Sequence, residues 1–229
     1  VLAALGRETA GGFERVVPGG AEQLTNVHAG GVRLPGSITL PTGAKGLVLF
    51  AHGSGSSRHS ARNRAVAEAR GEVIVFGDDD ILVETDWLAQ MTAPLLIDNA
   101  RRVGAVGGEV VPVFPDGLPA WVREWHAPLR FRPDTGPLEA RHSPMGANLA
   151  FPRRVFGQLG LFHTALDRAA GNYFSGGDSE MLRRVRRAGL EVWFVPAAAV
   201  HHQMPASRTT FRYAARHAFD SARSRVIDR

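Results

Sequence analysis

The 229-residue sequence contains no cysteine. Disulfide bonds, thiolate chemistry and cysteine-based zinc sites are therefore excluded. No hydrophobic run approaches the roughly 20 residues that a membrane-spanning helix needs, and the N-terminus lacks the pattern of a secretory signal. Val1 stands where an initiating Met would be, which leaves open that a segment precedes this chain. We expect the chain in the cytoplasm or at the inner face of the membrane.

Lysine is almost absent as well. The sequence has 27 basic residues and a net charge of +5, and Lys45 is its one lysine, so the other 26 are arginines. Arginine suits bidentate binding of phosphate, so this balance is compatible with an anionic ligand or a membrane surface. The arginines are not clustered enough to indicate nucleic acid. Hydrophobic residues make up 44% and charged residues 21%, which is typical of a globular protein.

A Gly-x-Ser-x-Gly nucleophile motif is also missing, although one loop is suggestive of a hydrolase. A strand predicted over 46–51 runs into the loop 52–60, which starts His-Gly-Ser-Gly. This segment resembles the start of a dienelactone-hydrolase-type α/β hydrolase, where such a loop helps to form the oxyanion hole. The alternatives are a plain Gly/Ser turn or a phosphate cradle, although a Walker-type Gly-Lys-Ser/Thr ending is absent. An esterase built around His52 to Ser57 stays an alternative, with Ser54 on the loop rather than on an elbow.

Three consecutive carboxylates follow a short buried strand predicted over 73–76. Asp78, Asp79 and Asp80 come directly after it, and the carboxyl ends of strands are where open α/β sheets bind ligands. Adjacent carboxylates repel one another unless a cation or hydrogen-bond donors compensate. Hard oxygen ligands select Mg²⁺ or Mn²⁺. The sequence therefore predicts a divalent metal site here, with an exposed acidic turn as the alternative.

The flanks of this triplet carry a resemblance. Residues 61–70 read Ala-Arg-Asn-Arg-Ala-Val-Ala-Glu-Ala-Arg, and residues 81–88 read Ile-Leu-Val-Glu-Thr-Asp-Trp-Leu. Together they resemble the middle of family-2 glycosyltransferases of the GT-A fold, in which an Ala-Arg-Asn helix, a strand ending in Asp-x-Asp and a Trp-Leu helix follow one another. The resemblance implies a divalent metal and the diphosphate of a nucleotide-sugar. The donor-binding residues that it implies are Arg62, Asn63, Asp78, Asp79 and Asp80, with Asp78 and Asp80 as metal ligands.

The next part of the chain predicts a helix and a strand, then an irregular stretch. Hydrophobic spacing predicts a helix over 84–98 with Thr85 as its cap, and residues 104–111 predict a strand. The stretch 112–144 is rich in proline and contains Trp121 and Trp125, four residues apart. These two rings either stack on a sugar or acceptor or plug the core under a long loop.

Residues 145–156 read as a strand followed by a helix, with Pro152 in the first turn. This block resembles the Gly-Ala-Asn strand of the same family, and His163 stands where the family usually has Asp. The resemblance places Gly146 and Asn148 on the acceptor side, and Trp121 and Trp125 would lie there too if their rings stack on an acceptor.

A helix predicted from the spacing of Met181, Leu182 and Val185 has Asp178 near its N-terminus. An acid there is either a simple N-cap favoured by the helix dipole or a general base that takes the proton of an acceptor hydroxyl. The segment resembles the Glu-Asp motif of the family, with Gly177 in place of the Glu, and the resemblance makes Asp178 the catalytic base.

The C-terminal part begins with a strand predicted over 189–196. His201 and His202 follow, and the resemblance implies that one of them completes the metal site, where neutral imidazole is an acceptable ligand. The tail over 207–229 predicts a basic amphipathic helix. It would close over the diphosphate, lie on an anionic membrane or pack on the body as a solvated helix.

The four blocks together predict an α/β protein with the Rossmann-like GT-A fold, a mostly parallel sheet and helices on both faces. We expect two parts, a hydrolase-like segment over 1–60 and a glycosyltransferase-like catalytic body over 61–229. The implied activity is metal-dependent, inverting transfer of a sugar from a nucleoside-diphosphate donor to a polysaccharide, lipid-linked or small-molecule hydroxyl. The family's Pro-x-Tyr-Asn strand and Asp-Asp-x-Ser strand are missing, so an incomplete chain that binds no nucleotide is the second hypothesis.

Overall fold

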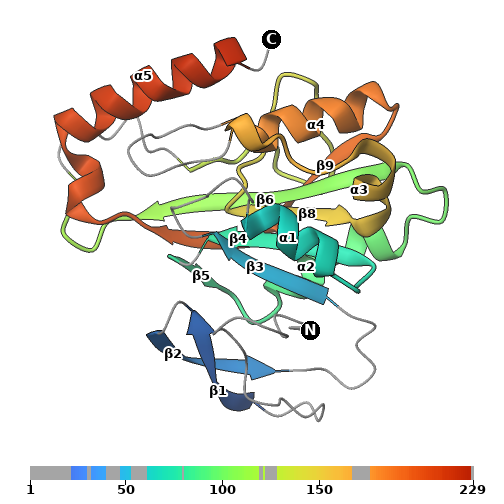
Figure 1. Cartoon of the computed structure of the whole chain (residues 1–229), viewed down its shortest axis with the longest axis horizontal. Helices are drawn as coiled ribbons and strands as arrows, with labels where there is room; N and C mark the ends of the chain where they lie inside the picture. Colours follow the sequence, from blue (N-terminus) through green and yellow to red (C-terminus); the bar gives the residue numbers. More distant parts are fainter. Residues whose placement is uncertain are drawn as a thin grey trace.

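A seven-stranded sheet forms the centre of the computed structural model (Figure 1). The structure describes residues 22–29, 32–39, 47–52, 61–78, 80–118, 121, 128–166 and 176–227. The strands of this sheet are β3 (Leu47–His52), β4 (Val73–Asp78), β5 (Ile81–Val83), β6 (Val103–Val113), β7 (Gly136–Pro137), β8 (Asn148–Pro152) and β9 (Glu191–Gln203). The helices are α1 (Ala61–Glu68), α2 (Trp87–Leu96), α3 (Arg153–Leu159), α4 (Gly177–Arg187) and α5 (Phe211–Ile227), with 3-10 turns η2 (Thr164–Leu166) and η3 (Ala206–Thr209).

The strand order is β3-β4-β8-β6-β9-β5, with β7 paired to β9. Strands β3 and β4 run parallel, as do β6 and β9, whereas β8 is antiparallel to both β4 and β6. Strands β5 and β7 are antiparallel to β9. The predicted α/β class is confirmed, but the sheet is mixed and not mostly parallel. The period of a hydrophobic run indicates a strand without fixing the direction of its neighbour.

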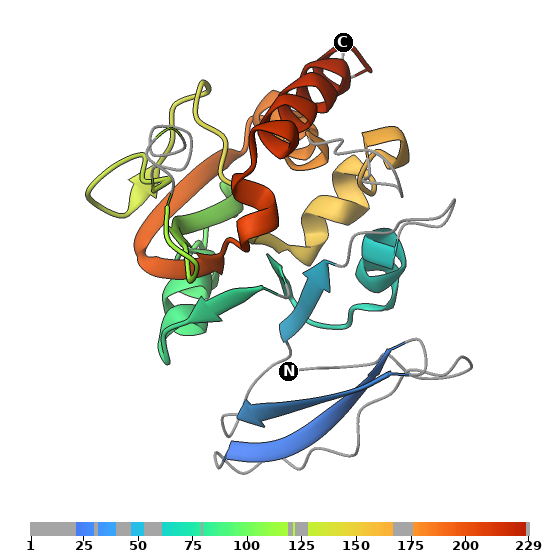
Figure 2. The ribbon, with the colours of Figure 1, turned by 90° about the vertical axis from the view of Figure 1, so that its left-hand side faces the viewer.

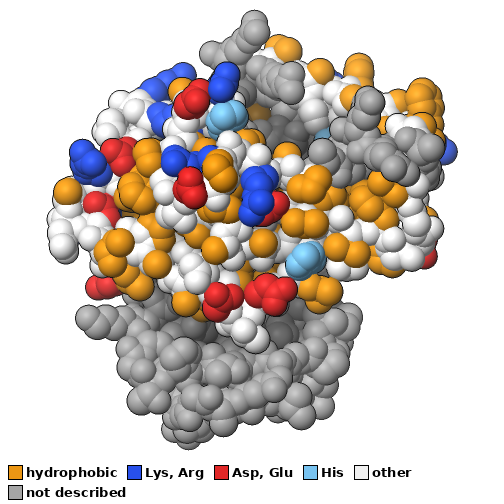
Figure 3. All heavy atoms as spheres, turned by 180° about the vertical axis from the view of Figure 1, so that it is seen from behind, with side chains coloured by type: hydrophobic (Ala, Val, Ile, Leu, Met, Phe, Trp, Pro, Cys, Tyr) orange, Lys and Arg blue, Asp and Glu red, His pale blue; other side chains and the backbone are white. Residues whose placement is uncertain are grey.

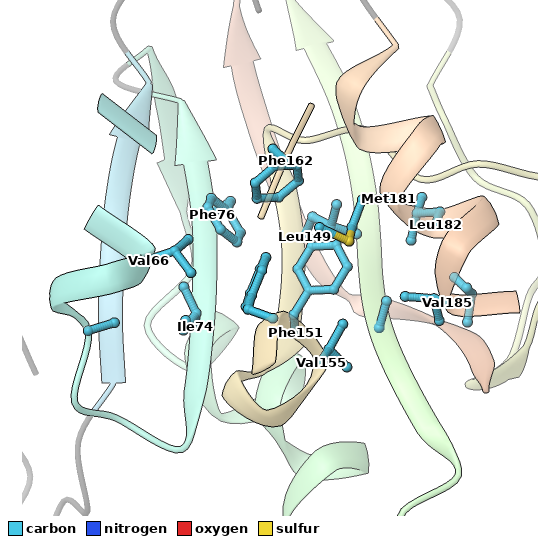
Figure 4. Packing of buried hydrophobic residues seen from close by; sticks show 14 residues of the cluster. Val66, Ile74, Phe76, Leu149, Phe151, Val155, Phe162, Met181, Leu182 and Val185 are labelled. Atoms are coloured by element: carbon cyan, nitrogen blue, oxygen red, sulfur yellow. The ribbon is translucent and has the colours of Figure 1, made fainter. Parts of the chain in front are cut away.

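One face of the sheet packs against α1, α3 and α4. The labelled side chains of this core in Figure 4 are Val66, Ile74, Phe76, Leu149, Phe151, Val155, Phe162, Met181, Leu182 and Val185. The ring of Phe162 meets that of Phe76 edge to face, with centroids 5.3 Å apart, and lies 6.0 Å from that of Phe151. Such aromatic pairs add about 0.5–1.5 kcal/mol beyond the area they bury. The cluster therefore anchors the loop that carries Phe162.

The opposite face packs against α2, so the expectation of helices on both faces is confirmed. Trp87 and Met91 of α2 are buried against hydrophobic residues of β4, β6 and β9. The predicted cap at Thr85 is wrong, because α2 begins at Trp87 and Asp86 is its N-cap residue. The amide of Trp87 bonds instead to the carbonyl of Glu84 (3.1 Å), so a turn fills the space where the helix was expected to start.

The N-terminal part contributes a hairpin and one strand of the main sheet. Strands β1 (Glu22–Ala29) and β2 (Val32–Thr39) pair antiparallel in a separate two-stranded sheet, which lies beside the main sheet in Figures 1 and 2. Strand β3 pairs with β4 and so joins the main sheet. The boundary predicted near residue 60 stays a prediction. The His-Gly-Ser-Gly loop after His52 lies outside the described residues.

The C-terminal helix α5, drawn in red in Figures 1 and 2, follows η3. Its side chains Phe211, Phe219 and Val226 are exposed. Among the described residues, the structure contains no helix with both the length and the hydrophobicity to cross a membrane. On the face seen in Figure 3, acidic and basic side chains are interspersed with hydrophobic ones, so this face carries no single sign of charge.

Candidate functional site

The acidic end of β4 meets the C-terminal end of β9. The first five residues of β4 are buried and Asp78 at its end is half-buried. Strand β5 starts right after Asp80 and pairs antiparallel with β9, with Ile81 opposite His202. The amide of Gln203 also donates to the carbonyl of Asp80 (2.8 Å). This backbone pairing brings a histidine 122 positions away in the chain to the carboxylates of the Asp-x-Asp motif.

Asp78, Asp80 and His202 form a group that could hold a metal ion, with one ligand atom from each within 4.8 Å of the others. His202 Nε2 lies 2.9 Å from Asp80 Oδ1 and 3.9 Å from Asp78 Oδ2. Asp80 Oδ1 and His202 Nε2 are buried and face each other at 2.9 Å, but this contact lacks hydrogen-bond geometry, and neither atom has another hydrogen-bond partner in the part of the chain described here. Buried polar atoms are seldom left in this state. Two carboxylates and one imidazole suit a divalent cation, so the residues fit the predicted metal.

The structure distinguishes between the two candidate histidines. Neighbouring side chains of a strand point to opposite faces, so His201 turns away from the two acids. Its Nε2 lies 3.8 Å from Glu84 Oε1, and its side chain is 40% exposed. Of the two alternatives, the structure brings His202 and not His201 to the acids, and its role as a metal ligand stays a prediction. Asp79 lies outside the described residues.

An arginine that the sequence did not single out contacts the same group. Arg208 of η3 places Nη1 3.0 Å from Asp80 Oδ2. The site therefore includes a cation from the segment that joins β9 to α5. The sequence did contain a hint of this, since Arg208 is the first arginine of the basic tail over 207–229. Its distance along the chain from Asp80, however, does not predict a contact between the two residues.

The second half of the site is centred on Asp178, which lies in the first turn of α4 and is half-buried. The N-cap residue is Gly176, so the alternative of Asp178 as a simple N-cap is wrong. Arg62 of α1 donates from Nη1 to Asp178 Oδ1 (2.7 Å), and its guanidinium lies 3.7 Å from the ring centroid of Phe162. The Asp178 carboxylate therefore lies at a helix N-terminus and against a guanidinium.

Asn63, the neighbour of Arg62, also contacts Phe162. Its Nδ2 donates to the Phe162 carbonyl (2.9 Å), and its Oδ1 accepts from the Phe162 amide (3.0 Å). These contacts are structural, because they tie α1 to the loop before η2. The donor-binding roles of Arg62 and Asn63 stay predictions.

Asn148 holds the sheet together rather than facing an acceptor. It is 0% exposed. Its Nδ2 donates to the carbonyls of Glu109 (2.9 Å) and Ala198 (2.7 Å), and its Oδ1 accepts from Trp87 Nε1 (2.9 Å). The side chain is not accessible to an acceptor in this structure, and its acceptor-side role stays a prediction.

The other predicted acceptor-side residues differ in their surroundings. A Cβ at Gly146 would overlap the Asp178 carboxylate, so this glycine lies directly against the candidate base. Trp121 is 48% exposed, and its ring centroid lies 6.1 Å from that of Phe211 in α5. Trp121 thus does not plug the core, and contact with an acceptor stays a prediction. Trp125 lies outside the described residues.

Comparison with known proteins identifies the family. The model of glycosyltransferase-like family 2 matches residues 41–219.

The chain is 28% identical over 182 residues to the succinoglycan biosynthesis protein ExoM of Rhizobium meliloti, covering 77% of this chain and 54% of that protein. It is 26% identical over 155 residues to the glucosyl-dolichyl phosphate glucuronosyltransferase of Haloferax volcanii, covering 66% and 49%. The crystal structure of GalNAc-T7 with UDP, GalNAc and Mn²⁺ aligns at a TM-score of 0.45 and 20% identity, covering 63% of this chain and 30% of that one. The chain belongs to glycosyltransferase-like family 2.

This membership confirms the predicted family and the GT-A fold, and it extends further toward the N-terminus than expected. The family match begins at residue 41 and includes β3, which was assigned to a hydrolase-like segment. The resemblance to a dienelactone hydrolase finds no support in the comparisons. The chain spans about half the length of the two curated relatives described above.

Proposed function

We propose that this chain transfers a sugar from a nucleoside-diphosphate donor to a hydroxyl acceptor, with the help of a divalent metal and with inversion. One observation carries the proposal: Asp78, Asp80 and His202 converge at the end of β4, and the buried atoms Asp80 Oδ1 and His202 Nε2 lie 2.9 Å apart with no other hydrogen-bond partner in the described chain. Membership of the family and the names of the two curated relatives support sugar transfer.

The metal would be held by Asp78, Asp80 and His202, and it would supply positive charge that stabilises the leaving diphosphate. Arg208, which lies against Asp80, would add a charge-assisted contact to a phosphate oxygen. Both groups lie at the carboxyl end of β4, where ligands bind in α/β sheets.

Asp178 would act as the general base on the acceptor side. Its carboxylate takes the proton of the acceptor hydroxyl while that oxygen forms a bond to the anomeric carbon. The bond from the anomeric carbon to the diphosphate oxygen breaks, and its electron pair leaves with the diphosphate. A single displacement of this kind inverts the configuration at the anomeric carbon. The kind of acceptor, whether polysaccharide, lipid-linked or small-molecule, stays open.

The first experiment measures thermal unfolding of the chain with Mn²⁺ and with uridine, guanosine, thymidine or adenosine diphosphate. A diphosphate at about 100 times its Kd adds roughly 2.7 kcal/mol, which raises the Tm by about 5–10 °C for a domain of this size. Asp80→Asn removes one metal ligand, and we expect it to abolish the shift. Asp134→Asn makes the same change at an exposed acid of the loop before β7, and its shift should match that of the unaltered chain.

Each outcome discriminates between the hypotheses. A shift that needs Mn²⁺ and disappears in Asp80→Asn supports the donor site. A cooperative melt with no shift for any diphosphate contradicts it and favours a folded chain that binds no nucleotide. A shift that persists in Asp80→Asn places the diphosphate elsewhere.

A further inference from the structure

The ion pair between Arg62 and Asp178 links two elements that the sequence separates by 116 positions. Arg62 was expected to bind the donor, but its side chain is only 11% exposed and its Nη1 lies 2.7 Å from Asp178 Oδ1. A guanidinium so deeply placed is already committed to a carboxylate inside the protein. We propose that Arg62 is a positioning residue, which orients Asp178 for proton transfer. The inference rests on the proposed role of Asp178 as the base.

The guanidinium of Arg62 also packs against an aromatic ring. It lies over the ring of Phe162 at 3.7 Å from the centroid, a cation–π contact. The side chain of Asn63 forms hydrogen bonds with both the amide and the carbonyl of the same Phe162. Two adjacent residues of α1 therefore hold one phenylalanine, whose ring packs in the aromatic core (Figure 4). Because the Arg62 side chain contacts both the Phe162 ring and the Asp178 carboxylate, it has little rotamer freedom left to lose when Asp178 accepts a proton.

Two glycines provide the space for this pair. A Cβ on Gly177 would come within 2.8 Å of Arg62 Nη2, and a Cβ on Gly146 would overlap the Asp178 carboxylate. A side chain at position 177 would therefore contact the end of the Arg62 side chain, which would have to shift.

The pairing leaves one carboxylate oxygen for chemistry. Across the described residues, Oδ1 of Asp178 is the oxygen that has a hydrogen-bond partner, so Oδ2 is left to accept the hydroxyl proton. The side chain of Asp178 remains 30% exposed, which gives an acceptor access. Arg62 thus selects the oxygen and the direction from which the proton arrives. Misplacement of a reacting group by about 1 Å can cost on the order of 100-fold in rate.

The test compares Arg62→Ala and Arg62→Lys with the unaltered chain and with Arg102→Ala. Arg102 is the matched control, since its side chain is 70% exposed and its partner Glu191 lies 3.5 Å away. We expect Arg62→Ala to lower kcat by on the order of 100-fold, with the donor KM within about twofold of its original value. Ethylguanidinium added to Arg62→Ala should restore part of kcat, and it should leave Arg102→Ala unchanged.

The readouts separate a positioning residue from the alternatives. A raised donor KM with unchanged kcat overturns the proposal and returns Arg62 to donor binding. Loss of rate without rescue, together with a lowered Tm, overturns it in favour of a purely structural role. A crystal structure of Arg62→Ala gives an answer that needs no turnover: a carboxylate of Asp178 that keeps its position contradicts positioning, and one that moves or rotates supports it. If the unaltered chain transfers no sugar, or if Asp178→Asn keeps full activity, the proposed function fails, and that result is distinct from either outcome for Arg62.

Discussion

Asn148→Asp is the change that best tests how the two halves of the sheet are joined. The β6–β9 ladder is interrupted where Gly108 pairs with Val195 and the next pair is Val110 with Val200. The Asn148 amide fills this irregularity by donating to the carbonyls of Glu109 and Ala198. An aspartate has nearly the same shape, but it replaces the nitrogen donor with an oxygen.

The cost of this change can be worked out from the contacts. The bond from Trp87 Nε1 to Oδ1 (2.9 Å) is retained, whereas the buried contact to the Ala198 carbonyl and the part-buried contact to the Glu109 carbonyl both lose their donor. A buried polar group left unsatisfied costs about 1–3 kcal/mol, so two cost about 2–6 kcal/mol. A buried charge adds to this sum. Typical domains are stable by only about 5–15 kcal/mol.

The assay is urea unfolding, followed by far-ultraviolet circular dichroism, with thermal melting as a second measure. We expect Asn148→Asp to lower the free energy of unfolding by at least about 2 kcal/mol and the Tm by about 4 °C or more. Asn99→Asp is the matched control, since Asn99 is exposed, and its stability should stay within about 0.5 kcal/mol of the unaltered chain.

A stability of Asn148→Asp equal to that of the control would refute the reasoning. It would mean that water or a backbone shift replaces the amide donor, and that Asn148 is not needed to close the interrupted ladder. A variant that is stable but has lost only activity would restore Asn148 to the acceptor side.

Two further predictions concern arginines. Arg184→Ala removes hydrogen bonds to Glu180 and to the main-chain carbonyls of Leu159 and Leu161. We expect the free energy of unfolding, measured in urea, to fall by about 2 kcal/mol or more. The exposed control Arg187→Ala should change this free energy little. Arg208→Ala removes the cation 3.0 Å from Asp80. Because this arginine competes with a metal for the same carboxylate, we expect Mn²⁺ to bind the nucleotide-free variant more tightly by about 0.2–1 kcal/mol in titration calorimetry. Weaker Mn²⁺ binding would contradict a competition between the two cations.

Much of the fold could be predicted because its signals are local. The hydrophobic run before Asp78 and the helical spacing of Met181, Leu182 and Val185 both correspond to elements of the structure. Strand β9 runs on to Gln203, beyond the strand predicted over 189–196, because pairing with β5 and β6 extends it past the residues that show a strand pattern.

The sequence by itself determined which residue types gather at the site: acids after β4, an acid in the first turn of α4 and histidines near the end of β9. Only the tertiary structure decided that His202 rather than His201 meets the acids, that Asn148 closes the sheet, and that Arg62 holds Asp178. The physical reason is that periodicity and capping report on neighbours within a few positions along the chain. The contacts of the site join residues far apart in sequence, and their partners are fixed by strand register and by the packing of helices on the sheet.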